Sequence, residues 1–243
     1  MTRESTMLRT IVTIPTYNER ENIDPLLDAI LNLGAEGLET LVVDDDSPDR
    51  TAAAVQQVAS RRPGVHLLVR TTERGRGTAG VAGFRRALEM KADLVFEMDA
   101  DFSHHPRHLP DMVRVLRDRE ADMVVGSRFI QGGRDADRPF RRRLISELAR
   151  RYIRLVLGVK PQDVTSGYRG FTAALLEACD LATCRASGPS ILLEILFRAT
   201  LKGFSIKEVP IEFCDRTRGQ STLTFKILLQ SLIFVPRLRM RGW

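Results

Sequence analysis

The chain has 243 residues, of which 43% are hydrophobic and 28% are charged, which is ordinary for a soluble globular protein with one large domain. No apolar run reaches the length of a membrane span, and the formal net charge of +6 favours anionic partners such as phosphates, nucleic acid or an acidic membrane surface. The three cysteines form no metal-binding pattern, and the start of the chain lacks a signal-peptide pattern, so we expect reduced thiols and a cytoplasmic location.

Strand-like and helix-like segments alternate through the first half of the chain. Leu8 to Ile14 is rich in Thr, Ile and Val, which predicts a first strand that ends at Pro15. Apolar residues then recur at helical spacing as far as Leu31. Further strands are expected at residues 40–43, 65–69, 94–98 and 123–125, with helices at 51–60, up to about 90, and at 106–119. This alternation predicts an α/β fold: a mostly parallel sheet with helices on both faces.

The second half of the chain contains more loops and more arginine. The predicted elements are an arginine-rich loop at 131–143, a basic helix to about 157, a Gly-flanked segment at 163–171, helices near 173–182 and 190–202, and a strand at 205–213. We divide the chain into one domain, residues 1–220, and a C-terminal amphipathic segment, residues 221–243.

The C-terminal segment has an apolar face followed by basic residues. The apolar face comprises Leu228, Leu229, Leu232, Ile233 and Val235, and the basic end comprises Arg237, Arg239 and Arg241 before Trp243. The pattern suits a helix lying in the membrane interface, with its cations toward anionic headgroups. A C-terminal helix packed on the core is the alternative, because both produce one apolar face.

Two aspartates, Asp99 and Asp101, directly follow the buried strand predicted at 94–98. The carboxyl ends of parallel strands meet at one edge of a sheet, so this pair would converge with the Pro15–Glu19 loop, the aspartates at 44–46 and the Gly75–Gly80 loop. Carboxylates this close repel one another unless a cation lies between them, and hard oxygen ligands suit Mg²⁺ or Mn²⁺. The alternative is a solvated turn, because Asp is common in turns.

The Gly75–Gly80 segment has the spacing Gly-x-Gly-x-x-Gly. A nicotinamide-binding protein carries this motif in its first β-α turn, where this chain lacks it, so we exclude a dehydrogenase. No Gly-x-x-x-x-Gly-Lys-Ser/Thr loop is present either, and phosphate capture would therefore use a metal and arginines. His104 and His105 could be further ligands or polar residues at a helix start, and no Ser/His/Asp arrangement can be defended.

Arginines between Arg128 and Arg154 interrupt aromatic and aliphatic residues, and Arg169 follows Tyr168 in a Gly-flanked loop. Guanidinium groups near a metal site suit a substrate that carries phosphate, although an ordinary surface charge run would give the same composition. The chain has few aromatic residues to stack bases, which argues against nucleic acid as the partner.

Several motifs occur in a fixed order and carry a family resemblance. They are Ile14-Pro-Thr-Tyr-Asn-Glu19, Val43-Asp-Asp-Asp-Ser-Pro-Asp49, Gly75-Arg-Gly-Thr-Ala79, Met98-Asp-Ala-Asp-Phe-Ser-His-His-Pro106, Gly126-Ser-Arg128, Ser166-Gly-Tyr-Arg169 and Asp215-Arg-x-x-Gly-x-Ser221. Together they resemble the dolichol- or polyprenol-phosphate mannose synthases, inverting glycosyltransferases of family 2 with a GT-A fold. The resemblance covers about residues 8–225.

The resemblance implies a function for each matching position. The nucleotide would contact Pro15, Tyr17, Glu19, Asp44, Asp45 and Asp99. Mg²⁺ or Mn²⁺ would be held by Asp99, Asp101 and Ser103, although some members have Gln in place of Ser103. Phosphate groups would bind Arg128, Arg142, Arg143 and Arg169, with Asp101, Arg128 and Arg169 as the catalytic set and Glu194 at the sugar.

The implied reaction is the transfer of a hexose, mannose from GDP-mannose, to a polyprenyl or dolichyl monophosphate by an enzyme peripheral on the cytoplasmic face of a membrane. Gly75-Arg-Gly replaces the more usual Gly-Leu-Gly, and Thr222 replaces a common Lys, which leaves other donors such as UDP-glucose open. A non-catalytic sugar-nucleotide-binding relative would lack a metal carboxylate, and both are present here. A nucleotidyltransferase should carry a Gly-rich basic loop in the first β-α turn, which residues 16–21 do not supply.

Overall fold

The computed structural model describes residues 8–135, 140–184, 186, 188, 190–214 and 234–240, with the main chain alone for 140–144. Its first half alternates as expected: β1 (Thr10–Thr16), α1 (Arg20–Leu31), β2 (Leu38–Asp44), α2 (Thr51–Ala59), β3 (Val65–Val69), α3 (Arg76–Glu89), β4 (Leu94–Glu97), η1 (Pro106–His108) and α4 (Leu109–Arg117). The second half contains β5 (Met123–Ser127), β6 (Arg134–Asp135), α5 (Phe140–Leu157), β7 (Arg169–Thr172), α6 (Ala173–Ala178), α7 (Ser190–Leu201), β8 (Ile206–Pro210) and β9 (Glu212–Phe213).

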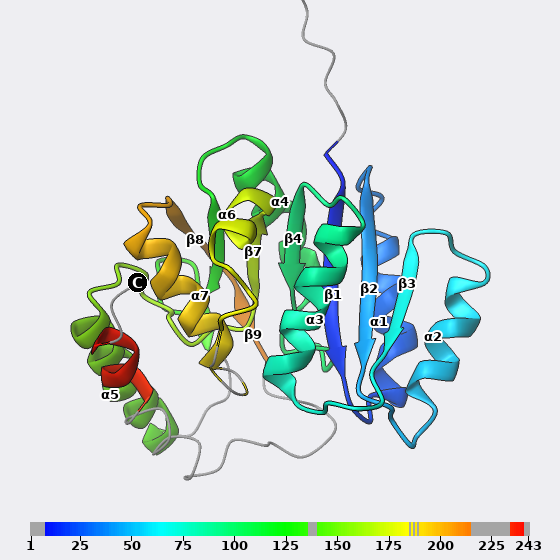
Figure 1. The fold of residues 1–243 in the computed structure, drawn as a ribbon, viewed down its shortest axis with the longest axis horizontal. Helices are drawn as coiled ribbons and strands as arrows, with labels where there is room; N and C mark the ends of the chain where they lie inside the picture. The colour runs from blue at the N-terminus through cyan, green and yellow to red at the C-terminus, as the bar shows by residue number, and fades with distance from the viewer. Residues whose placement is uncertain are drawn as a thin grey trace, which may run out of the picture.

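The central sheet has the strand order β3-β2-β1-β4-β7-β5-β8 (Figure 1). Strands β1, β2, β3 and β4 pair in parallel, and β8 is parallel to β5. Only β7 runs antiparallel, between β4 and β5, among the described strands of this sheet. The mostly parallel α/β sheet is therefore confirmed, and the carboxyl ends of β1, β2 and β4 lie along one edge.

The first strand continues through Pro15, so the prediction that Pro15 ends it was wrong. On one side of β1, Pro15 pairs with Val43 of β2. On the other side, the pairing of β1 with β4 ends before Pro15, at Thr13 and Glu97. Along a parallel strand the main-chain groups of successive residues alternate sides, and Thr13 O accepts from Met98 N on the β4 side. The nitrogen of Pro15 faces that same side, where no ladder bond is lost.

Two further strands differ from the sequence prediction. The segment at 169–172, expected as a loop, is inserted into the sheet as β7, where Gly170 lets Phe96 of β4 approach so closely that a Cβ would lie 2.2 Å from its ring. The strand expected at 205–213 is divided into β8, which pairs with β5, and β9, which pairs with β6. Between them, Ile211 N donates to Ser127 O at the end of β5, and Ile211 O accepts from Arg134 N of β6.

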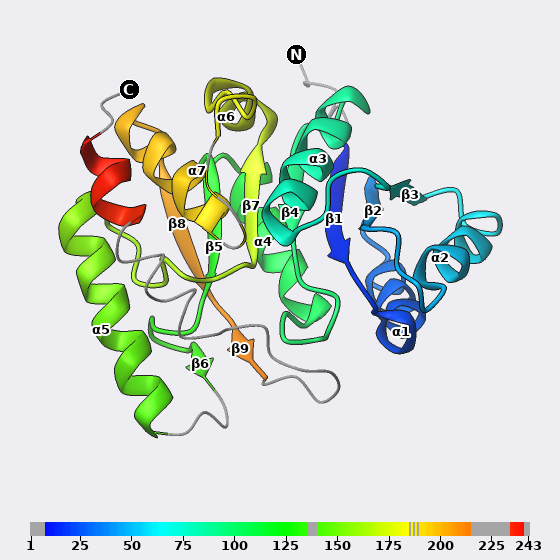
Figure 2. The ribbon, with the colours of Figure 1, turned by 60° about the horizontal axis from the view of Figure 1, so that its bottom comes forward.

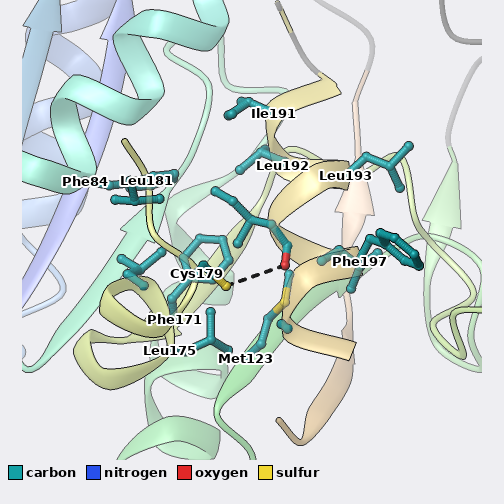
Figure 3. Packing of buried hydrophobic residues seen from close by; sticks show 14 of the residues in the cluster. Phe84, Met123, Phe171, Leu175, Cys179, Leu181, Ile191, Leu192, Leu193 and Phe197 are labelled. Atoms are coloured by element: carbon teal, nitrogen blue, oxygen red, sulfur yellow. Dashed lines mark hydrogen bonds between the residues drawn. The ribbon is translucent and has the colours of Figure 1, made fainter. Parts of the chain in front are cut away.

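Alternate residues of each strand enter two hydrophobic cores, one on each face of the sheet. One face packs against α1, α2 and α4, and the opposite face packs against α3, α5, α6 and α7. Figure 3 shows the second core where Phe171 of β7 meets the first turns of α7 and where Cys179 Sγ lies 3.9 Å from Ile195 O. Phe84 of α3 contacts the edge of Phe171 with ring centroids 5.4 Å apart.

A short helix at residues 234–240 lies beside α5 (Figure 2). Its Val235 and Leu238 are fully buried in the same core cluster as Ile153 and Leu157 of α5. This part of the C-terminal segment therefore packs on the core, as the alternative interpretation expects, whereas Leu228 and the other predicted apolar residues up to Ile233 lie outside the described residues. No helix in the described part of the chain has the length and apolar character needed to cross a membrane.

Candidate active site

Asp44 ends β2 and is fully buried. Its Oδ2 accepts hydrogen bonds from Thr16 Oγ1 at 2.9 Å and from Ser47 Oγ at 2.6 Å, and its Oδ1 accepts from Ser47 N at 2.9 Å. Asn18 N in turn donates to Ser47 Oγ at 3.0 Å. Asp44 thus ties the loop after β1 to the loop after β2, beside Tyr17, which is 51% exposed and available to a ligand.

Asp45 connects β2 to the start of α3. Its carboxylate pairs with Arg70 at 2.9 Å and accepts from Gly75 N at 2.7 Å. The next residue, Arg76, donates from Nη2 to Asp99 Oδ1 at 2.7 Å. Two consecutive residues at the N-terminus of α3 therefore contact the aspartates that follow β2 and β4. The structure brings the predicted acidic loops together at one rim.

Glu19 lies on the same rim, at the start of α1. It is half-buried, and its Oε2 accepts from Asn22 Nδ2 at 2.7 Å. Pro15 is buried within β1. The residues predicted to contact the nucleotide are thus gathered around the ends of β1, β2 and β4, and their contacts with a ligand stay a prediction.

Asp99 and Asp101 leave β4 in a tight turn around Phe102, whose φ is +61°. Asp101 is 4% exposed, and its Oδ1 accepts from Ser103 N at 3.0 Å and from Ser103 Oγ at 2.6 Å. The turn gathers carboxylate and hydroxyl oxygens, the donors that Mg²⁺ and Mn²⁺ prefer.

Within the described residues, no three His, Cys, Asp or Glu side chains cluster as a metal site. Mg²⁺ and Mn²⁺ commonly take two carboxylates from the protein and complete their coordination with water and substrate phosphates. The donor set of Asp99, Asp101 and Ser103 therefore fits such an ion, and the assignment of Asp99 and Asp101 as its carboxylate ligands stays a prediction.

His104 stabilises this turn through a hydrogen bond and ring stacking. Its Nδ1 accepts a hydrogen bond from Asp99 N at 3.0 Å, and its ring stacks on Tyr168 with centroids 5.1 Å apart. Burial lowers the pKa of His104, which keeps the imidazole neutral with its proton on Nε2. His105 is instead the N-cap of η1, where its Nδ1 accepts from Arg107 N, as the helix-start interpretation expects.

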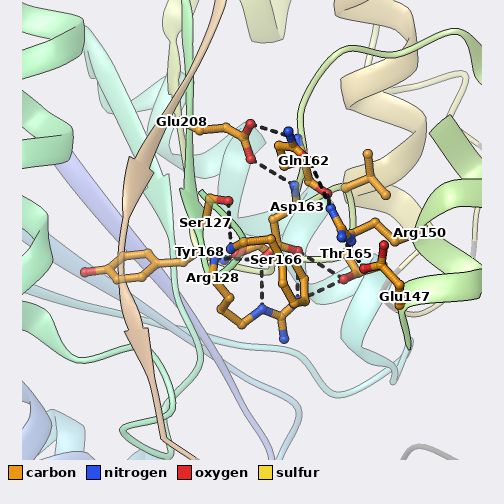
Figure 4. Close-up of polar contacts among 12 residues, drawn as sticks. Ser127, Arg128, Glu147, Arg150, Gln162, Asp163, Thr165, Ser166, Tyr168 and Glu208 are labelled. Atoms are coloured by element: carbon orange, nitrogen blue, oxygen red, sulfur yellow. Dashed lines mark hydrogen bonds and ion pairs between the residues drawn. The ribbon is translucent and has the colours of Figure 1, made fainter. Parts of the chain in front are cut away.

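Arg128 follows β5 and is held by a buried carboxylate (Figure 4). Its Nε lies 2.7 Å from Asp163 Oδ2 and its Nη2 lies 2.8 Å from Asp163 Oδ1, and Nη2 also donates to Thr165 Oγ1 at 2.9 Å. Burial alone would raise the pKa of Asp163, but the hydrogen bonds and charge of Arg128 outweigh it and lower that pKa. Within the described part of the chain, Nη1 of Arg128 is left without a hydrogen-bond partner.

Asp163 is itself held by its neighbours. Glu208 of β8 accepts from Asp163 N at 2.8 Å and from Gln162 N at 2.7 Å, and Arg150 of α5 donates to Gln162 O at 2.8 Å (Figure 4). Asp163, which orients Arg128, is thereby connected to α5 through the main chain of Gln162.

Arg169 and Glu194 are also buried, and both contact groups inside the protein. Arg169 is 1% exposed and donates to the carbonyl oxygens of Ser166, Val164 and Leu192, an arrangement that fixes the loop before β7 against α7. Glu194 is fully buried, pairs with Arg198 at 2.6 Å and accepts from Ala186 N at 2.8 Å. Their predicted contacts with phosphate and sugar stay predictions.

Arg142 and Arg143 lie in the first turn of α5, and their side chains lie outside the described residues. Sequence reasoning does not single out three charged residues that hold this site together: Arg76, Glu97 and Asp163. In the sequence, Arg76 stands out only as a departure from a glycine motif, and Glu97 lies within an apolar strand. A charged residue inside a buried strand signals a buried ion pair, and Glu97 carried that signal.

Comparisons with known proteins identify the family of the chain. The family model "Glycosyl transferase family 2" matches residues 11–179. A polyprenol monophosphomannose synthase of Mycolicibacterium smegmatis is 38% identical over 96% of this chain and 88% of its own length. An undecaprenyl-phosphate mannosyltransferase of Micrococcus luteus is 39% identical over 95% and 93%, and a dolichol-phosphate mannosyltransferase of Pyrococcus furiosus is 37% identical over 95% and 64%.

Among solved structures, glucosyl-3-phosphoglycerate synthase from Mycobacterium tuberculosis superposes with a TM-score of 0.71 at 21% identity, covering 97% of this chain and 80% of that one. That protein was crystallised with Mn²⁺, UDP-glucose and phosphoglyceric acid, and in another structure with Mg²⁺ and UDP. At this identity the likeness supports the GT-A fold alone. The family match over residues 11–179, with relatives more than one third identical across nearly the whole chain, makes this protein a member of glycosyl transferase family 2.

Proposed function

We propose that this enzyme transfers mannose from GDP-mannose to the monophosphate of a polyprenol at a membrane surface, with inversion at the anomeric carbon. The observation that carries the proposal is the gathering of Asp44, Asp45, Asp99 and Asp101 at one rim. The buried Arg128 lies over the Phe213 ring, which contacts the edge of the His104 ring beside Asp99. The mannosyltransferase names of the three relatives give the substrate class.

The donor half of the site binds and orients the nucleotide. Tyr17 and Glu19 face the base and ribose. Asp44 holds the loop after β1, on which both lie, through Thr16 and Ser47, and Asp45 holds the start of α3 through Gly75 N. Asp99 and Asp101 would hold Mg²⁺ or Mn²⁺, which would supply positive charge to the diphosphate leaving group. Ser103 keeps the Asp101 carboxylate in one orientation through two hydrogen bonds to Oδ1.

The acceptor half of the site binds a monophosphate. A phosphate oxygen is already anionic near pH 7, so the reaction needs no strong general base, which accords with the absence of a defensible Ser/His/Asp arrangement. Arg128 presents Nη1 to the acceptor while Asp163 binds its other two nitrogens, Nε and Nη2, and Arg142 and Arg143 add positive charge from the first turn of α5. Arginine offsets the repulsion between two polyanions that must approach each other.

The membrane contact is assigned to the outer face of α5. Ile145, Leu148 and Leu155 are 50%, 59% and 85% exposed and are spaced three and seven residues apart, so they form one stripe. Ile153 and Leu157 lie on the opposite, buried side of the same helix. Arg151 borders the stripe with its side chain 73% exposed. An apolar stripe bordered by arginine suits a helix resting in the interface of an anionic membrane. This supports our proposal that the enzyme is peripheral on the cytoplasmic face.

The test is to incubate the protein with vesicles that contain polyprenyl phosphate, with Mn²⁺ and a panel of radiolabelled nucleotide sugars. We expect label from GDP-mannose in the organic phase and its loss when EDTA removes the metal. Label from UDP-glucose alone would assign a different donor. No label from any nucleotide sugar would favour a non-catalytic sugar-nucleotide-binding protein.

A further inference from the structure

Arg76 lies between two carboxylates at the end of β4. Its Nη1 is 2.7 Å from Glu97 Oε1, and its Nη2 is 2.7 Å from Asp99 Oδ1. The Arg76 side chain is 29% exposed and Asp99 is 28% exposed, whereas Glu97 is fully buried. One guanidinium thus connects a carboxylate of the core to a carboxylate of the rim.

Glu97 is fixed in place by close packing under α3. A Cβ on Gly80 would lie 2.6 Å from Glu97 Oε2, so only glycine at that position leaves room for the carboxylate. An arginine guanidinium is protonated throughout the physiological pH range, so Arg76 stays a cation between the two carboxylates. Glu97 therefore anchors a permanent positive charge beside Asp99.

We propose that Arg76, anchored by Glu97, is a positioning residue that holds Asp99 in place before the divalent cation arrives and sets how tightly the carboxylates bind that cation. The inference rests on the proposed function, because it takes Asp99 as a metal ligand. A fixed cation at this position has two opposite effects. It orients Asp99, which assists catalysis, and it repels a doubly charged ion. The ion then binds weakly to the empty protein and enters and leaves with the nucleotide diphosphate.

The experiment compares Mn²⁺ binding, measured by electron paramagnetic resonance on protein without nucleotide, in the Glu97→Gln variant and in the Arg76→Leu/Glu97→Gln double variant. Both lack the buried carboxylate, so their difference isolates the charge of Arg76. We expect the double variant to bind Mn²⁺ at least about tenfold more tightly, since a unit charge acting on a divalent ion over about 6 Å in a water-like medium already gives that factor. Arg74→Leu is the matched control. Arg74 lies two residues before Arg76 and pairs with the exposed Asp46, so its replacement should leave Mn²⁺ binding unchanged.

Thermal unfolding of the metal-free protein provides a second measurement. Arg76→Leu alone should unfold at a lower temperature than the double variant, because it leaves Glu97 buried without its cation. Arg76→Lys should keep Mn²⁺ binding weak but lower the turnover number, because an ammonium cannot bridge both carboxylates as the guanidinium fork does. If the wild type transfers sugar but the double variant binds Mn²⁺ no more tightly than Glu97→Gln does, the inference is overturned. If the wild type neither binds Mn²⁺ nor transfers sugar, the proposed function falls with it.

Discussion

Charge is arranged differently in the two halves of the sheet. In the half formed by β3, β2, β1 and β4, carboxylates follow the ends of parallel strands, and the side chains of Asp45 and Asp99 contact the N-terminus of α3 at the rim. In the half formed by β7, β5 and β8, two arginines are buried and use most of their donors inside the protein. Arg128 is 7% exposed and Arg169 is 1% exposed.

The difference accords with the proposed function. In the donor half, carboxylate oxygens at a shared edge would hold a divalent cation, which would supply positive charge to the diphosphate. A lipid monophosphate needs a cation that is already oriented, and a long flexible arginine is oriented by a carboxylate behind it. Asp163 supplies that carboxylate for Arg128. In the donor half the roles are reversed, because the cation Arg76 orients the carboxylate of Asp99.

The largest effect is expected in the donor half, from Asp101→Asn. The amide keeps the acceptor that Ser103 uses but loses the charge that a divalent cation needs. Sugar transfer should fall by about a thousandfold, in line with the several kcal/mol that metal ions contribute to charge stabilisation. Chemical denaturation should show a change in the free energy of unfolding of less than about 1 kcal/mol, because the hydrogen bonds persist. Unchanged turnover would remove Asp101 from the metal site.

In the acceptor half, Asp163→Asn should act on stability as well as on activity. The substitution leaves the guanidinium of Arg128 buried without its counter-charge, which costs about 3–5 kcal/mol of unfolding free energy. Urea denaturation measures the loss, and Asp46→Asn on the exposed rim is the matched control. A loss as small as that of the control would mean that solvent, not Asp163, stabilises Arg128.

The pH dependence of the same pair has a definite sign. The pKa of Asp163 is lower in the folded protein than in the unfolded chain, where it is about 3.9. The stabilisation by the pair is therefore complete above that unfolded value and is lost as the pH falls through the lower folded value. The difference in unfolding free energy between wild type and Asp163→Asn should be constant from pH 7 to pH 5 and shrink below about pH 4.

The sequence predicted the donor half better than the acceptor half, for a physical reason. Strand ends in a parallel sheet converge by geometry, so Asp44 and Asp99 could be placed at one rim from the alternation of elements alone. The pairing of Arg128 with Asp163 spans 35 residues and depends on how β8 and the 163–169 loop pack, which no local pattern encodes. The insertion of β7 was missed for the same reason, since four residues with a central glycine resemble a turn.

The contact of the acceptor half with membrane can be tested separately from chemistry. Replacing Leu148 and Leu155 together by Ser removes most of the exposed apolar stripe on α5 and should weaken binding to anionic vesicles by about tenfold or more. Leu201→Ser is the control, because Leu201 is 46% exposed on α7, outside the stripe. Vesicle sedimentation measures binding, and transfer to a short water-soluble polyprenyl phosphate should be unchanged. Full vesicle binding by the double variant would assign the membrane contact to another surface.

The smallest effect distinguishes neighbouring aspartates within the donor half. Asp45 is 4% exposed and accepts from Gly75 N, whereas the Asp46 side chain is 53% exposed and contacts Arg74 in solvent. Asp46→Ala should therefore change the free energy of unfolding by less than about 0.5 kcal/mol, the usual range for an exposed pair, and leave the KM for the nucleotide sugar unchanged. Asp45→Ala should raise that KM, because it frees the loop before α3 from the end of β2. Steady-state kinetics on the two variants compares them directly, and an equal rise in KM for both would mean that the whole acidic run, not its buried members, binds the donor.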